Sequence, residues 1–208
     1  MQCRPGVHRA DQGRRVTLLD SALAQDGARV SGQRFAQSRL NRRLAVGDSI
    51  AKAHVMRTML ISCFSFTEVA RCAAELMPKS GGAMITLTFG ASMRAMPNYN
   101  VMGVAKAALE ASVRYLAADF GPRGIRVNAI SAGPVRTLAG SGIGEARAMF
   151  AFQQKHSPLG RGVTLDELGG SALYLLSDLS GGVTGEIHYV DCGYNIVLMP
   201  KPEDLKVE

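Results

Sequence analysis

Helical and strand patterns alternate along this chain from Met59 to Asp191, and this alternation constrains the possible folds more than any other feature. Apolar residues recur at helical spacing in LISCFSFTEVARCAAELM, VMGVAKAALEASVRYLAADF and LGGSALYLLSDL. Short, mostly apolar strand patterns follow them, namely AMITLTF (83–89), IRVNAIS (125–131) and IHYVD (187–191). Such repeats favour right-handed crossovers and a parallel sheet with helices on both faces. We therefore predict an α/β fold with a doubly wound parallel sheet.

The ends of these helices carry local signals. The first helix stops at the breaker KSGG of residues 79–82, and the second has Asn98 or Asn100 as a candidate cap. The sequence TLDE at 164–167 has the form of a capping box and predicts the start of the third helix. A short additional helix is expected over 145–154.

Ligands of doubly wound sheets bind beyond the carboxyl ends of the strands. In this chain those ends are followed by the loops after Phe89, Ser131 and Asp191. The second of these loops contains Gly133-Pro134, which by itself indicates only a turn. We therefore expect ligands to bind at these loops, with the candidate chemistry on two of the three.

The first quarter of the chain has a different composition. Residues 1–57 hold 11 Lys/Arg against 4 Asp/Glu, whereas residues 58–208 hold 13 of each. Its short apolar stretches, such as VTLL at 16–19, show no sustained period. We predict a basic, poorly structured segment over 1–56, an α/β part over 57–199, which the family resemblance described below makes the catalytic part, and a tail over 200–208. The sheet is then incomplete, and AMITLTF forms an unpaired edge that is prone to aggregate.

Composition and spacing argue against several classes of protein. The sequence shows no apolar run of the roughly 20 residues that a membrane span requires and no signal peptide at its start, so we expect a cytoplasmic protein without a membrane partner. The four cysteines and four histidines are too scattered for a metal site. A nucleic-acid-binding basic arm is a further hypothesis, but the first segment lacks interleaved aromatic residues, and we predict no nucleic-acid partner.

The run YNVMGVAK identifies a family. Together with RTMLISCFSFTEVA, GIRVNAISAGPVRTLAG and GVTGEIHYVDCGYN, it resembles the bacterial NADH-dependent enoyl-acyl carrier protein reductases of the short-chain dehydrogenase/reductase superfamily. In that family six residues separate the catalytic tyrosine from the lysine, which here are Tyr99 and Lys106. The shorter spacing of the carbonyl-reducing relatives would require lysine where this chain has Gly103. The resemblance covers about Arg57 to Met199 and implies a Rossmann-like fold.

The resemblance also implies a reaction, a cofactor and an assembly. The family reduces the trans-2-enoyl thioester carried by acyl carrier protein in fatty-acid elongation, uses NADH and usually forms homotetramers. Tyr99 would donate a hydrogen bond to the thioester oxygen, and Lys106 would hold the ribose hydroxyls of the cofactor. The residues that would contact the cofactor besides Lys106 are Val135, Arg136, Thr137, Leu138 and Ala139.

Helix geometry agrees with a paired role for Tyr99 and Lys106. Seven residues of α-helix rotate about 700°, so the two side chains would share a face about 10.5 Å apart along the axis. Helical side chains lean toward the N-terminus, which tips the lysine toward the phenol. A nearby ammonium favours the phenolate, and we therefore expect Lys106 to lower the pKa of Tyr99.

A substrate pocket is implied by the same resemblance. Its expected residues are Phe89, Met102, Met149 and Phe150. Met149 and Phe150 follow a glycine-rich stretch and would lie on a mobile substrate lid, although an ordinary packed amphipathic helix explains them equally well. Relatives usually have a tyrosine where this chain has Phe89, so we expect less precise substrate binding and a gain in turnover from Phe89→Tyr.

The first segment leaves two interpretations of the chain open. The family has a glycine-rich turn for the cofactor pyrophosphate near its start, and no such turn is recognisable before Arg57. We interpret the segment before about His54 as the product of a misassigned or out-of-frame start. The chain is then either a reductase by descent or an inactive remnant that can only associate with intact subunits.

Overall fold

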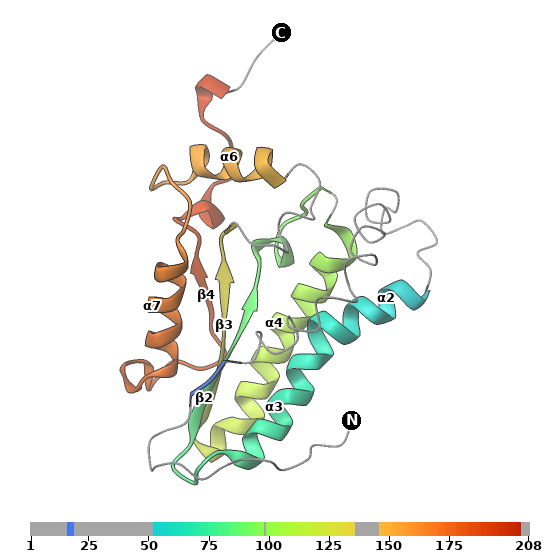
Figure 1. The fold of residues 1–208 in the computed structure, drawn as a ribbon, viewed down its shortest axis with the longest axis vertical. Coiled ribbons are helices and arrows are strands. Elements are labelled where there is room, and N and C mark those ends of the chain that lie inside the picture. Colours follow the sequence, from blue (N-terminus) through green and yellow to red (C-terminus); the bar gives the residue numbers. More distant parts are fainter. Residues whose placement is uncertain (1–15, 19–51, 98, 136–145, 205–208) are drawn as a thin grey trace.

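The fold consists of one parallel sheet with helices on both faces (Figure 1). The structure is a computed structural model that describes residues 16–18, 52–97, 99–135 and 146–204. The strands are β1 (Val16–Leu18), β2 (Gly82–Thr88), β3 (Ile125–Ala132) and β4 (Ile187–Val190). The α-helices are α2 (Lys52–Met59), α3 (Ser65–Leu76), α4 (Asn100–Phe120), α6 (Ala146–His156) and α7 (Leu165–Leu176). The remaining turns are η2 (Leu60–Phe64), η3 (Gly90–Ser92), η4 (Gly121–Arg123), η5 (Asp178–Ser180), η6 (Tyr194–Ile196) and η7 (Pro202–Asp204).

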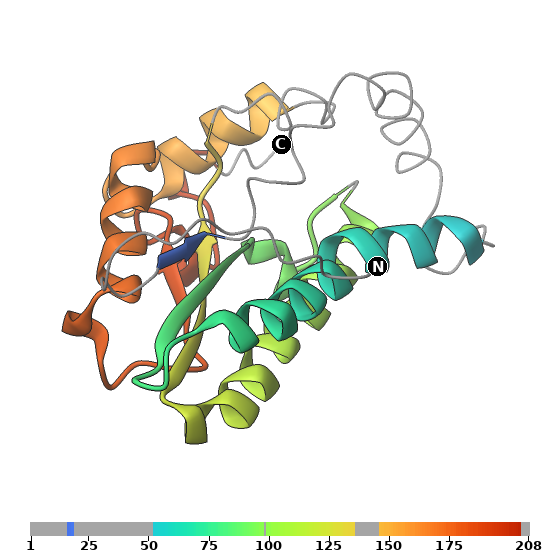
Figure 2. The ribbon, with the colours of Figure 1, turned by 60° about the horizontal axis from the view of Figure 1, so that its bottom comes forward.

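The sheet has the strand order β1-β2-β3-β4, and every adjacent pair is parallel. In β2 and β3, Met84 lies beside Val127 and Ile85 beside Asn128. Helices α3 and α4 cover one face, while α7 covers the other (Figures 1 and 2). The predicted α/β class, the doubly wound parallel sheet and the three predicted strands are confirmed.

Each face of the sheet has its own hydrophobic core because strand side chains alternate between the two faces. Met84, Val127 and Ala129 pack against α3 and α4. Ile85 and Ile130 pack against Leu175 of α7. Both sides of β2 and β3 are therefore buried, which is why their sequences are nearly continuous apolar runs.

The first predicted helix is longer than the pattern suggested. Helix α2 continues through the π-helical turn η2 into α3 without a break in helical dihedrals at Met59 or Phe64. Helix α3 ends at Leu76, and the chain then reverses at Gly81, which has a φ of 92°. A Cβ on Gly81 would lie 2.1 Å from the carbonyl oxygen of Gly124, so this turn accepts only glycine.

The start of α4 differs from the prediction. Asn100 is the first helical residue and has a φ of 30°, and the capping position belongs to Tyr99, which makes no side-chain capping bond. Asn98, the other expected cap, lies outside the described residues. The expected asparagine cap is therefore wrong for Asn100. In contrast, the predicted capping box of α7 is confirmed in both of its hydrogen bonds.

Strand β1 lies in the segment that was expected to lack structure. Its three residues pair with Ala83, Met84 and Ile85 of β2. The expectation of a wholly unpaired β2 edge is thus wrong for these three residues. A run of three strand residues is too short to show a period in the sequence. Within the described ranges, no helix has the length and apolar character needed to cross a membrane.

Candidate functional site

The candidate site lies at the carboxyl ends of the parallel strands β2, β3 and β4. Thr88, Ser131 and Tyr189 form one row across the three strands just before this edge. Helix α6 lies across the carboxyl ends of these strands (Figure 1). The parallel topology therefore brings together the segments that follow Phe89, Ser131 and Asp191, as the sequence predicted.

Tyr99 contacts Phe89, the residue directly after β2, through an aromatic pair. Its ring meets the ring of Phe89 edge to face, with the centroids 5.4 Å apart and the planes at 61°. Burial raises the pKa of the Tyr99 phenol above its ordinary value. The expected lowering of this pKa by Lys106 is therefore wrong in direction, because the loss of hydration dominates. The phenol is therefore protonated at neutral pH, as an ordinary tyrosine is, and can donate a hydrogen bond.

Lys106 contacts the same strand end by a polar bond. Its Nζ donates a hydrogen bond of 2.8 Å to the backbone carbonyl of Leu87. Tyr99 and Lys106 thus approach neighbouring residues of one strand end, Phe89 and Leu87. The straight helical path expected between them does not hold, because Tyr99 precedes the helix and Asn100 has a positive φ.

Gly103 allows α4 to approach the loop after β2. A Cβ at this position would lie 2.8 Å from the backbone oxygen of Ala91 and 3.9 Å from the Tyr99 ring. Only glycine leaves room for this contact without a shift of the loop. The sequence identified Gly103 solely as the residue that excludes the shorter spacing, because close packing between segments leaves no local signal.

The loop after β3 is bound tightly to β4. The Gly133 amide donates a hydrogen bond of 2.9 Å to the carbonyl of Val190. A Cβ on Gly133 would lie 2.9 Å from the Cα of Asp191, so the backbones touch. Val135, the first of the expected cofactor contacts, is partly buried at the end of the described part of this loop. The other expected contacts, Arg136, Thr137, Leu138 and Ala139, lie outside the described residues.

Asp191 organises the turn after β4. Its carboxylate accepts hydrogen bonds from the amides of Gly193 and Asn195, at 3.0 and 2.8 Å, and from the Asn195 side chain at 3.1 Å. Arg94, in the loop after β2, donates to the carbonyls of Asn195 and Val197. The loops after β2 and β4 are therefore tied together, and neither link was predicted from the sequence.

The expected substrate-pocket residues lie in different surroundings. Met102 receives a hydrogen bond of 3.6 Å from Ser62 of η2, which directs its sulfur toward that turn. Met149 and Phe150 lie on α6 and are both partly buried. The four residues Phe89, Met102, Met149 and Phe150 stay a prediction as a common pocket.

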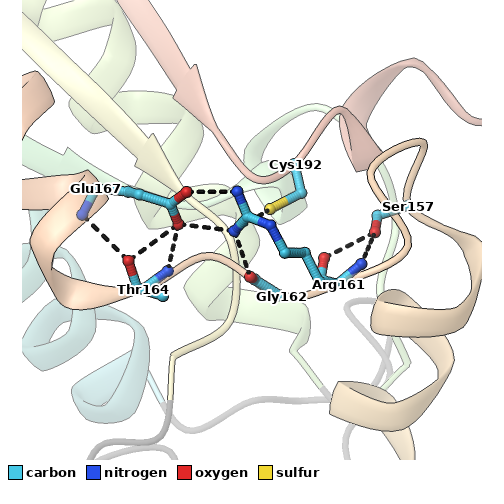
Figure 3. A network of polar contacts seen from close by, with 6 residues as sticks. All are labelled: Ser157, Arg161, Gly162, Thr164, Glu167 and Cys192. Atoms are coloured by element: carbon cyan, nitrogen blue, oxygen red, sulfur yellow. Dashed lines mark hydrogen bonds and ion pairs between the residues drawn. The ribbon is translucent and has the colours of Figure 1, made fainter.

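A polar network fixes the connection between α6 and α7 (Figure 3). The Arg161 guanidinium forms a two-point ion pair with Glu167, at 3.0 and 2.6 Å, and reaches the Cys192 sulfur at 3.7 Å. Together with Thr164, Arg161 lowers the pKa of Glu167 to about 2. The Ser157 hydroxyl donates to the carbonyl of Arg161 at 2.8 Å. The network holds the start of α7 against the turn after β4.

An open pocket of about 500 Å³ lies beside this network. Its lining includes Glu167, Gly170 and Ser171 of α7 and Tyr189 and Asp191 at the end of β4. Tyr99 and Lys106 are absent from its lining, so this pocket and the predicted catalytic pair are separate features of the described chain.

The described residues contain no cluster of three potential metal ligands among histidine, cysteine and acidic side chains. Cys63 and Cys192 are free thiols, whereas Cys72 is disulfide-bonded. The Cys192 backbone has a φ of 60°, a left-handed conformation that is uncommon for a residue with a side chain.

Comparison with known proteins agrees with the sequence motifs. The family described as enoyl-(acyl carrier protein) reductase matches residues 37–195, so its match begins before the expected boundary at residue 57. The chain is 76% identical over 151 residues to enoyl-(acyl-carrier-protein) reductase (NADH) 2 of Rhizobium meliloti (strain 1021), which covers 73% of this chain and 56% of that protein. The chain spans about half the length of the curated relatives it matches.

Two solved structures share both fold and sequence with the chain. The FabI structure from Candidatus Liberibacter asiaticus is 59% identical, with a TM-score of 0.74 over 79% of this chain and 62% of that one. The enoyl-(acyl-carrier-protein) reductase of Anaplasma phagocytophilum, solved in complex with NAD, is 49% identical, with a TM-score of 0.73 and the same coverage. The family match extends over most of the chain, and the chain therefore belongs to the enoyl-(acyl carrier protein) reductase family.

Proposed function

We propose that this chain carries the catalytic part of an NADH-dependent enoyl-acyl carrier protein reductase, which converts a trans-2-enoyl thioester to the saturated acyl thioester. The observation that carries the proposal is the placement of Tyr99 and Lys106 against the last residues of β2. Strand ends of this kind are where doubly wound sheets bind dinucleotides. The family match and the relatives named for NADH support the same reaction class.

The donors at this strand end suit an NADH molecule and a thioester. A lysine ammonium offers three hydrogen-bond donors, enough for a backbone carbonyl and for ribose hydroxyls. Lys106 already uses one donor on Leu87, which fixes the direction of its side chain. Bound NADH would supply the hydride. Lys106 would hold the ribose.

Tyr99 would act on the substrate. Hydride addition to the β-carbon of an enoyl thioester moves negative charge onto the thioester oxygen, which a prearranged donor stabilises. The Tyr99 phenol is protonated at neutral pH and can serve as this donor, and burial raises its pKa further. The edge-to-face contact with Phe89 restricts the ring, so the hydroxyl is aimed before the substrate arrives.

A fluorescence titration with NADH tests the proposal. We expect the chain to bind NADH and Lys106→Met to weaken binding by about 10-fold or more, because a charge-assisted hydrogen bond to the ribose is lost. Lys79→Met is the matched control, since Lys79 is an exposed lysine in the turn before β2. Equal affinity of the Lys106→Met and Lys79→Met variants would contradict the role of Lys106.

The second candidate function is association without catalysis. It is favoured by the coverage of only about half of the relatives' length and by exposed apolar side chains along η2, among them Leu60, Ile61 and Phe64. Such a remnant would pack against intact subunits of the homotetramer that the family resemblance implies. Absence of NADH binding, combined with co-purification with a full-length relative, would favour this second function.

A further inference from the structure

Glu110 is a buried acidic residue at the centre of α4. Only 3% of its surface is exposed, although it carries a carboxylate. The Thr88 hydroxyl, itself buried, donates a hydrogen bond of 2.7 Å to its Oε1. Burying a carboxylate is costly unless hydrogen bonds and nearby positive charge compensate for lost hydration. A buried glutamate on the main helix of the site therefore calls for a specific role.

The position of Thr88 ties Glu110 to the candidate site. Thr88 is the last residue of β2 and stands between Leu87, which binds Lys106, and Phe89, which contacts Tyr99. Its hydroxyl points toward α4, because it reaches Glu110 there. The consecutive residues Leu87, Thr88 and Phe89 are thus each held from the side of α4. Lys106 and Glu110 of α4 bind the first two, and Tyr99 at the N-terminal cap contacts the third.

Lys106 and Glu110 are also neighbours along the helix. They are four residues apart on α4, which puts their Cβ atoms about 5–6 Å from each other on one face. Interactions between charges are stronger away from water, and Glu110 is almost completely buried. Glu110 is therefore placed to act on the ammonium of Lys106 as well as on Thr88.

We propose that Glu110 is a positioning residue of the reductase site, which locks the end of β2 through Thr88 and, from one helical turn away, attracts the Lys106 ammonium and directs it at the strand end. This inference rests on the proposed function, since it assigns Glu110 a task in holding the cofactor-binding lysine. Glu110 itself touches neither substrate nor cofactor in this account.

Other charged and titratable groups lie around the same strand ends. Tyr189 of β4 is in electrostatic range of Glu110, and also of Asp191, Arg94 and Glu186. Burial, followed by the charges of Glu110 and Asp191, raises the pKa of the Tyr189 phenol. Arg94 acts in the opposite direction on Tyr189. Glu110 differs from the other carboxylates in its place one helical turn from Lys106.

The acylation of Lys106 as a function of pH tests this inference on the full chain without cofactor. A pulse of acetic anhydride across a pH series, followed by peptide mass spectrometry, gives the pH midpoint at which Lys106 becomes reactive. We expect Glu110→Gln to lower this midpoint by about one pH unit, because the negative charge is lost while an acceptor for Thr88 remains. Lys79 in the same sample serves as the internal reference.

The controls separate an electrostatic from a merely structural role. Glu75→Gln changes an exposed glutamate of α3, whose side chain is 72% exposed, and should leave the Lys106 midpoint unchanged. An unchanged midpoint in Glu110→Gln would overturn the inference, since a purely structural glutamate is replaced well by glutamine. Glu110→Leu should lower the Lys106 midpoint as well. If the leucine variant does not fold, the midpoint of the isosteric Glu110→Gln variant alone tests the inference. The midpoint can shift whether or not NADH binds, so failure of the proposed function is detected separately.

Discussion

Gly103 shows how a single residue shapes the candidate site. Alanine is favoured over glycine in a helix by about 1 kcal/mol, yet a methyl group here would lie 2.8 Å from the Ala91 carbonyl oxygen. We predict that Gly103→Ala destabilises the chain by roughly 1–3 kcal/mol, as overpacking against backbone does. Gly169→Ala on α7 meets no atom within 4 Å and should stabilise by up to about 1 kcal/mol. Urea unfolding measures both, and a Gly103→Ala variant at least as stable as the parent contradicts the packing argument.

At this scale the sequence indicated some residues of the site and missed others. Tyr99 and Lys106 were predicted because the resemblance to the family rests on a pattern within one short run, and their catalytic roles stay a prediction. Arg94 was missed because its partner Val197 lies 103 residues away, and no periodicity links the two. The hydrogen bond between Thr88 and Glu110 was not predicted for a related reason, because the two residues lie on different elements and no local pattern links them.

Helix α7 allows a test at the scale of a secondary-structure element. The pKa of Glu167 falls from 4.5 to about 2 through its bonds to Arg161 and Thr164. Because the folded carboxyl has the lower pKa, its stabilising contribution is complete above about pH 4.5 and is lost as the pH falls toward about 2. We predict that Glu167→Gln is less stable than the parent at neutral pH and that this difference shrinks through that window.

Unfolding curves at a series of pH values measure the effect on α7. Glu75→Gln, which alters an exposed glutamate outside this network, is the control variant. A stability difference between parent and Glu167→Gln that stays constant from neutral pH to about pH 2 would contradict the assigned role of the capping network.

The elements differ in how well their sequences predicted them. The capping box at Thr164 and the strands β2, β3 and β4 have strong local signals and were found within a residue or so of their observed bounds. The π-helical turn η2 was not foreseen, since it interrupts a helix whose apolar pattern runs on. The start of α4 was misjudged because the positive φ of Asn100 makes it the first helical residue and leaves the cap position to Tyr99.

Exposed apolar side chains on the described surface predict that copies of the chain associate with one another. Exposed apolar side chains gather on the helical layer, including Leu60, Ile61 and Phe64, which are each more than half exposed. We expect the double variant Ile61→Lys and Phe64→Lys to reduce self-association in sedimentation velocity, because burying two ammonium groups in an interface is costly. Leu198→Lys, at a residue that is 89% exposed near the C-terminus, should leave association unchanged. If the double variant and Leu198→Lys associate equally, η2 is not part of the interface and the prediction is wrong.

The most direct test of the central claim is the rate at which the chain consumes NADH in the presence of a trans-2-enoyl thioester. The account predicts consumption by the parent and a loss of about 100-fold or more in Tyr99→Phe, since removal of one donor to a developing oxyanion costs that much. Tyr115→Phe, on the same helix at a residue that is 75% exposed, should keep the parent rate. A Tyr99→Phe variant as fast as the parent, or a parent that consumes no NADH, would contradict the account.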